Sequence, residues 1–196
     1  WGMFKKVVVA DNCAVFVDTI YGNVEGYNAS TLAIAAILFS FQIYCDFSGY
    51  SDIAIGVAKL LGIRLRKNFN YPYFATSIKA FWGRWHISLS SWFRDYVYIP
   101  LGGNRVGKVK HKINLVITFL VSGLWHGASW NFLIWGAYYG ILIMAERFII
   151  GKKADRLPYV VRLIPTLIFT LIGWVIFYYT DFSLVLQHLA ALFGLD

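Results

Sequence analysis

The stretch Asn114-Leu-Val-Ile-Thr-Phe-Leu-Val-Ser-Gly-Leu-Trp-His-Gly-Ala-Ser-Trp-Asn131 joins two strongly apolar segments through a short turn. The chain is apolar from Asn114 to Leu124 and again from Trp130 to Met144, and only Trp125 to Ser129 separates the two runs. Basic residues stand before the first run and after the second. If both basic ends lie on the same side of a membrane, the chain enters it, turns near His126 and returns.

The position of His126 along this hairpin predicts its depth. A helix from Lys112 to His126 rises only about 20 Å at about 1.5 Å per residue, whereas the hydrocarbon core is about 30 Å thick. We therefore expect His126 to lie within the membrane, toward its outer side. Histidines at membrane depth are rare and usually functional.

The composition supports a membrane protein. Of the 196 residues 59% are hydrophobic, 19% are aromatic and only 14% are charged, far from the profile of a soluble globular domain. The net charge of +8 does not indicate nucleic-acid binding, because the cations fall in short clusters between apolar segments, as in cytoplasmic loops. These clusters are Lys59/Arg64/Arg66/Lys67, Arg105/Lys108/Lys110/Lys112 and Lys152/Lys153/Arg156/Arg162.

Two further spans are expected outside the hairpin. The uncharged run from Ala29 to Cys45 is about as short as a spanning helix can be, and another span is expected from Thr166 to Tyr179, after Pro165. After the first span, Asp46-Phe-Ser-Gly-Tyr-Ser-Asp52 reads either as a capping and packing turn or as part of a site. A short apolar helix then runs from Ile53 to Leu61 and ends at Gly62.

Residues 68–105 contain no uninterrupted apolar run long enough to span. Trp82, Trp85 and Trp92 alternate with cations there, a pattern typical of interfacial or re-entrant helices, and a turn follows at Pro100 to Arg105. The expected fold class is all-α, a polytopic membrane protein with transmembrane helices plus re-entrant or interfacial helices. Residues 1–196 are expected to form a single membrane-embedded domain, a fragment that lacks spans on its N-terminal side and on its C-terminal side.

The candidate chemistry rests on His126 and His86, each of which follows a tryptophan in aromatic sequence. A desolvated imidazole stays neutral and can accept a proton, which suits a general base that activates a hydroxyl against an acyl carbonyl. The alternatives are a helix-packing histidine at the Gly123/Gly127 contact for His126 and an interfacial ring beside Arg84 for His86.

Other polar residues are assigned weaker roles. We expect His111 to be a solvated loop residue, His188 to lie on a helix surface, and Asp95 either to neutralise Arg94 or to orient a histidine. Cys13 and Cys45 are isolated and are expected to pack as small apolar residues, and no spacing of ligands resembles a metal site.

Six stretches resemble the membrane-bound O-acyltransferase family, in particular the bacterial branch that contains the alginate O-acetyltransferase membrane subunit and the D-alanyl transferase of teichoic acid. Their order and spacing make a chance match very unlikely, and together they cover most of the chain. They are Gly2 to Asp11, Asp46 to Asp52, Asn68-Phe-Asn-Tyr-Pro-Tyr73, Phe81 to Asp95, Pro100-Leu-Gly-Gly-Asn104 and Ser122-Gly-Leu-Trp-His-Gly127.

The resemblance implies a multi-pass enzyme of the bacterial inner membrane in which His126, within Trp-His-Gly, is catalytic and His86 is the second, upstream histidine. The substrate-binding candidates are Asp46, Asp52, Asp95, Trp125 and Asn131. No bound cofactor or metal is expected, and the acyl donor is expected to be acetyl-CoA or another acyl thioester carrier. Expected partners are the lipid bilayer and a polysaccharide or a separate extracytoplasmic acyltransferase.

The expected function is transfer of acetyl groups across the membrane toward hydroxyls of an exported or cell-surface polysaccharide of the alginate kind. D-alanyl transfer to teichoic acid remains an alternative within the family. Outside it, a transporter or channel without chemistry would also use broken helices and buried titratable groups, and a purely structural membrane subunit would tolerate substitution of both histidines.

Overall fold

The computed structural model describes residues 1–151 and 156–195, so Lys152 and Lys153 of the third basic cluster lie outside the described residues. Within these ranges every regular element is helical, which confirms the all-α class. The chain divides into two compact units, one formed by residues 1–68 with 181–195 and the other by residues 69–180.

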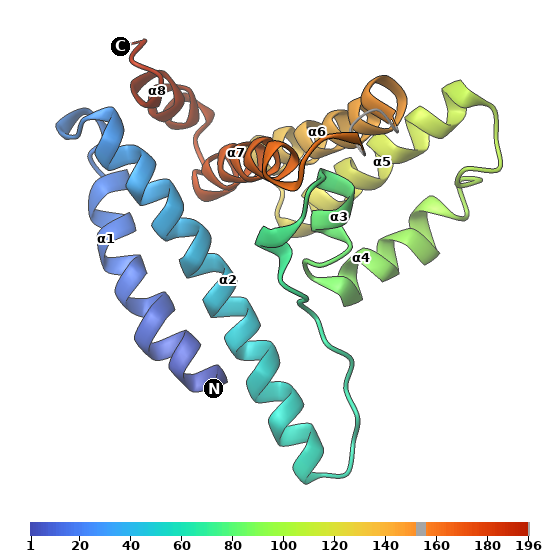
Figure 1. The fold of residues 1–196 in the computed structure, drawn as a ribbon, viewed down its shortest axis with the longest axis horizontal. Helices are drawn as coiled ribbons and strands as arrows, with labels where there is room; N and C mark the ends of the chain where they lie inside the picture. Colours follow the sequence, from blue (N-terminus) through green and yellow to red (C-terminus); the bar gives the residue numbers. More distant parts are fainter. Residues whose placement is uncertain (152–155, 196) are drawn as a thin grey trace. The chain divides into compact units, whose positions relative to one another are not determined.

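The first unit is built on one long helix, α2, which spans Ala29–Leu60. The Asn28 side chain caps its start by accepting a hydrogen bond from the Thr31 amide, and Gly62 follows its end with a positive φ of 74°. The preceding helical segment packs along α2, as Figure 1 shows for α1, and α8 also contacts α2. The other elements of this unit are η1 (Phe4–Ala10), α1 (Asp11–Tyr21), η2 (Val24–Gly26) and α8 (Phe182–Leu192).

Of the two alternatives for Asp46 to Asp52, the capping turn was wrong. Helix α2 runs through the whole stretch, because its two carboxylates are compensated by lysines of η1. Lys6 Nζ lies 2.8 Å from an Asp46 oxygen, and Lys5 Nζ lies 2.8 Å from an Asp52 oxygen. The predicted end of this helical region just before Gly62 is confirmed.

The second unit contains an antiparallel hairpin of α5 (Lys108–His126) and α6 (Trp130–Ala145), as the apolar pattern predicted. Helix α7 (Tyr159–Tyr178) packs against α6, and short helices lie at the start of the unit (Figure 1). Residues 69–105 contain short elements only, and a turn does follow at Pro100 to Arg105. These elements are η3 (Pro72–Phe74), α3 (Ile78–Trp82), α4 (Ile87–Phe93) and η4 (Arg94–Tyr98), with η5 (Glu146–Ile150) after α6.

Glycines allow α5 and α6 to approach at backbone distance. A Cβ placed on Gly123 would lie 2.1 Å from the Phe132 carbonyl oxygen, and one on Gly136 would lie 2.4 Å from the Phe119 carbonyl oxygen. Small residues at such contacts are the usual way for helices to pack closely within a membrane. The contact lies next to the turn that carries His126.

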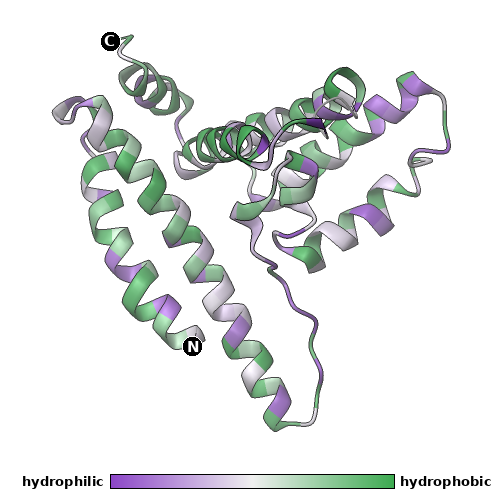
Figure 2. Ribbon diagram, viewed as in Figure 1, coloured by the Kyte–Doolittle hydropathy of each residue, from purple (hydrophilic) through white to green (hydrophobic). Residues whose placement is uncertain are grey.

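Three helical segments are long and apolar enough to cross a membrane, namely Ala29–Leu60, Trp130–Ile150 and Tyr159–Tyr178. Figure 2 shows apolar residues along α6 and α7 and hydrophilic residues gathered at the start of α5. The last span starts earlier than predicted, because Pro165 lies inside α7 rather than before it. Proline in the first two turns interrupts few backbone hydrogen bonds, and spanning helices tolerate it.

Candidate functional site

His86 occupies an unusual backbone position at the start of α4. It is the N-cap residue, with φ 43° and ψ 55° in the left-handed region, which a non-glycine residue seldom adopts. Holding such a conformation costs about 1–3 kcal/mol and is typical of functional sites. The preceding Trp85 is buried and anchors the segment, with its ring 4.8 Å from that of Trp174 and stacked 5.6 Å from that of Phe81.

His126 is the last residue of α5 and faces an aromatic lining from the two following helices. Its ring lies edge-on to Trp135 of α6 at 5.2 Å and to Phe177 of α7 at 5.1 Å, and Phe132 lies 6.0 Å away. Gly127 fits against the Phe132 ring, since a Cβ there would lie 2.7 Å from it. The chain can turn beside the imidazole because this position carries no side chain.

The structure brings the two histidines to the same tryptophan. The Trp125 ring lies 4.9 Å from the ring of His126 and 6.4 Å from the ring of His86, edge-on in both cases. Burial of the ring, and secondarily the charge of His126, lower the pKa of His86 from the ordinary 6.5 to about 4. His86 is therefore neutral at pH 7 and can accept a proton.

Helix α6 carries two buried polar side chains, Asn131 and Trp135, and Trp135 contacts the His126 ring. Asn131 is 1% exposed, and its side-chain N–H donates to the Tyr179 carbonyl, which links the start of α6 to the end of α7. Its Oδ1 and the indole nitrogen of Trp135 have no hydrogen-bond partner in the described part of the chain. Because buried polar groups are nearly always paired, these two atoms are candidates for contact with a bound molecule.

The three aspartates named as candidates are all ion-paired. Asp95 bonds its neighbour Arg94 through both oxygens, at 2.7 and 3.1 Å, as one of its two predicted roles required. Asp46 and Asp52 bind lysines in the first unit, whereas both histidines belong to the second.

Two of the weaker predictions were wrong. His111 is 6% exposed within α5, where its Nε2 lies 2.9 Å from the Tyr98 hydroxyl, so it is not a solvated loop residue. His188 lies on a helix as expected, but it is fully buried, with its ring 4.5 Å from that of Tyr21. In both cases a partner distant in sequence covers the ring.

Trp135 was not singled out in the sequence, although it contacts the His126 ring. A signal was available, because Asn131, Trp135 and Tyr139 are spaced four residues apart and so share one face of α6. All three are at most 1% exposed. The periodicity alone could have grouped them with the turn.

Comparison with known proteins identifies the family of the chain. The sequence model of MBOAT, the membrane-bound O-acyltransferase family, matches residues 10–187. The chain belongs to this family. Its membership accounts for the polytopic helical fold.

Curated proteins resemble the chain over about two thirds of its length or more. A "Probable alginate O-acetylase AlgI" of Azotobacter vinelandii is 41% identical over 193 residues, which cover 98% of this chain and 38% of that protein. A "Peptidoglycan O-acetyltransferase" of Helicobacter pylori is 40% identical over 198 residues, covering 100% of this chain and 38% of that protein. A "Teichoic acid D-alanyltransferase" of Streptococcus thermophilus is 36% identical over 135 residues, covering 65% and 32% respectively. The chain thus spans only about a third to two fifths of the length of these relatives.

Proposed function

We propose that the whole protein is a membrane O-acetyltransferase that transfers acetyl groups to hydroxyls of an exported or cell-surface polysaccharide. The observation that carries this proposal is the pair of imidazoles, His86 and His126, whose rings both lie close to the ring of Trp125. The relatives named for alginate and peptidoglycan acetylation are about 40% identical to the chain, whereas the relative named for D-alanyl transfer is 36% identical over a shorter stretch. This difference favours acetyl over D-alanyl as the transferred group, and a polysaccharide over teichoic acid as the acceptor.

In the proposed reaction His126 is the general base. Its neutral imidazole takes the proton from the acceptor hydroxyl while the hydroxyl oxygen attacks the acyl carbonyl carbon. A carbon–oxygen bond forms, the carbon–sulfur bond of the thioester donor breaks, and the imidazolium returns the proton to the leaving thiolate. The donor in this proposal is acetyl-CoA or another acyl thioester, and the aromatic lining limits hydrolysis by excluding water.

His86 assists in this scheme as a second neutral imidazole near Trp125. A nearby positive charge would oppose protonation of His126, so a neutral His86 keeps that cost low. Asn131 and Trp125 are proposed to bind substrate, Asn131 through its unpaired Oδ1. For Asp46, Asp52 and Asp95, the observed ion pairs favour charge compensation over contact with substrate.

The proposed setting is the bacterial inner membrane, crossed several times, with acceptor hydroxyls on its far side. An extracytoplasmic acyltransferase that receives the acyl group would be an equivalent acceptor. We further propose that the chain forms part of one membrane-embedded catalytic domain.

The test compares cells that carry the full-length protein as wild type, His126→Ala or Leu124→Ala, at matched membrane abundance. Leu124 is the matched control because it lies in the same turn of α5 and is half exposed. Mild base releases ester-linked acyl groups from the surface polysaccharide, and the released acid is identified. We expect acetate from wild type and Leu124→Ala and none from His126→Ala.

Other outcomes of this test choose between the alternatives. Release of D-alanine instead of acetate would assign the second activity of the family. Unchanged acetate from His126→Ala would refute the catalytic role of this histidine and favour a transporter or a structural subunit.

A further inference from the structure

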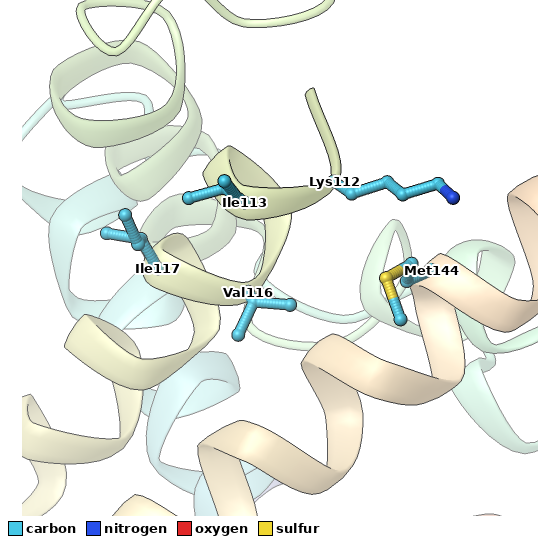
Figure 3. A pocket seen from close by; sticks show the side chains of 5 residues that line it. All are labelled: Lys112, Ile113, Val116, Ile117 and Met144. Atoms are coloured by element: carbon cyan, nitrogen blue, oxygen red, sulfur yellow. The ribbon is translucent and has the colours of Figure 1, made fainter. Parts of the chain in front are cut away.

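An open apolar groove lies on the α5–α6 hairpin, at the end away from His126. It has a volume of about 210 Å³ and is lined by Ile113, Val116 and Ile117 of α5 and by Met144 of α6, with Lys112 at its edge. Figure 3 shows the Lys112 side chain extending from α5 toward the side of Met144. The exposed lining of the groove is therefore entirely hydrocarbon, and the Lys112 side chain carries its ammonium beyond the edge of the groove.

The charge at this edge has no carboxylate partner among the described residues. Lys112 Nζ lies 5.2 Å from the centre of the Phe148 ring, a cation–π contact. In residues 1–151 and 156–195, the lysines at the start of α5 form no ion pair, so their charges are not neutralised there. A cationic site of this kind favours an anionic ligand.

The groove lies near one end of a membrane span. Met144 stands six residues before the end of the span Trp130–Ile150, a rise of about 9 Å along the helix. On α5, Val109 lies between Lys108 and Lys110 and is 71% exposed, and Ile113 directly follows Lys112 and is 50% exposed. Apolar side chains exposed among lysines at the end of a span are typical of the zone where acyl chains meet headgroups.

We propose that this groove binds one anionic phospholipid of the surrounding bilayer, such as phosphatidylglycerol. The lipid phosphate lies against the Lys112 ammonium, and the first part of an acyl chain packs against Ile113, Val116, Ile117 and Met144. The apolar walls alone would also suit a protein helix. The uncompensated lysine favours a phosphate group, because a basic residue near an anionic headgroup contributes attraction that an apolar helix cannot supply.

The test uses the full-length protein in detergent, with native mass spectrometry to count retained lipids after addition of phosphatidylglycerol or phosphatidylcholine. Lys112→Gln removes the charge, Val116→Trp fills the groove, and Lys110→Gln is the matched control on the same helix. We expect wild type and Lys110→Gln to retain one phosphatidylglycerol in preference to phosphatidylcholine. Lys112→Gln should weaken that binding about fivefold, from about 1 kcal/mol per basic residue, and Val116→Trp should abolish it.

Equal retention of the two lipids by wild type, or equal behaviour of Lys112→Gln and Lys110→Gln, would overturn the proposal. Retention that persists in Val116→Trp would place the lipid elsewhere and overturn it as well. Absence of any retained lipid in wild type would mean that another part of the protein fills the groove, which also overturns it. The readout does not depend on acyl transfer, so this inference and the proposed function fail separately.

Discussion

Gly123→Ala tests whether the close approach of α5 and α6 positions His126. The added methyl group would lie 2.1 Å from the Phe132 carbonyl oxygen, whereas ordinary contact begins at 3.4 Å. The obstacle is backbone and cannot rotate away, so the two helices must separate locally by roughly 1 Å. Because His126 follows three residues later on α5 and its lining residue Trp135 is on α6, the imidazole shifts relative to its surroundings.

The expected cost follows from this displacement. A misplacement of about 1 Å in a catalytic constellation can lower the rate about 100-fold, and overpacking of a helix contact destabilises by about 1–3 kcal/mol. The replacement also adds about 1 kcal/mol of helix propensity, which offsets part of the loss in stability but none of the loss in rate. Activity should therefore fall much more than stability.

Gly56→Ala is the matched control. Gly56 lies inside α2, and nothing lies within 4 Å of a Cβ placed there. The same substitution should keep full activity and raise the thermal midpoint slightly, because only the propensity gain remains.

The assay measures ester-linked acetate on the surface polysaccharide per unit of full-length protein in the membrane, with thermal midpoints in detergent. Gly123→Ala is expected to lose about 99% of the wild-type rate. Activity of Gly123→Ala within twofold of Gly56→Ala would refute the idea that the glycine contact positions the imidazole.

Three further predictions concern single residues of the second unit. His86→Asn should keep the left-handed backbone conformation, which asparagine tolerates, so the thermal midpoint should change little. If His86 assists proton transfer, the same substitution should lower kcat at least about 100-fold, which enzyme kinetics measures. Folding lowers the pKa of His86 from 6.5 to about 4, so between these pH values the unfolded chain binds more protons than the folded one. The free energy of unfolding should therefore fall as the pH decreases from about 6.5 to 4. In His86→Asn the thermal midpoint should depend less on pH over this range. Asn131→Leu should cost about 1–3 kcal/mol in unfolding free energy, because the buried Tyr179 carbonyl loses its donor.

Each of these has an outcome that contradicts it. Wild-type kcat in His86→Asn would leave His86 a purely structural residue. If the thermal midpoint depended on pH in the same way in wild type and in His86→Asn, the pKa of His86 would not be lowered by folding. An unchanged midpoint in Asn131→Leu would mean that the link between α6 and α7 does not contribute to stability.

The sequence by itself determined the α5–α6 hairpin and its turn. Two apolar runs joined by the short segment Trp125 to Ser129 can bury their apolar faces most simply by folding back on each other as a helical hairpin. Local sequence signals set the ends of the two helices. The Ser129 side chain caps α6, and Gly62 follows the end of α2 with the positive φ that glycine supplies. The motif Trp-His-Gly was also sufficient to mark His126 as a candidate, because an imidazole is an unusual group in such apolar sequence.

Only the tertiary structure decided which polar groups find partners. Asp46 stays within a continuous helix because Lys6, forty residues earlier, neutralises it, and His111 is buried because Tyr98 meets its ring nitrogen. His86 and His126 reach the same tryptophan only because folding brings the start of α4 close to the end of α5. Local sequence sets backbone hydrogen bonding and apolar periodicity, whereas the cost of burying a polar or charged group depends on a partner that folding brings from elsewhere in the chain.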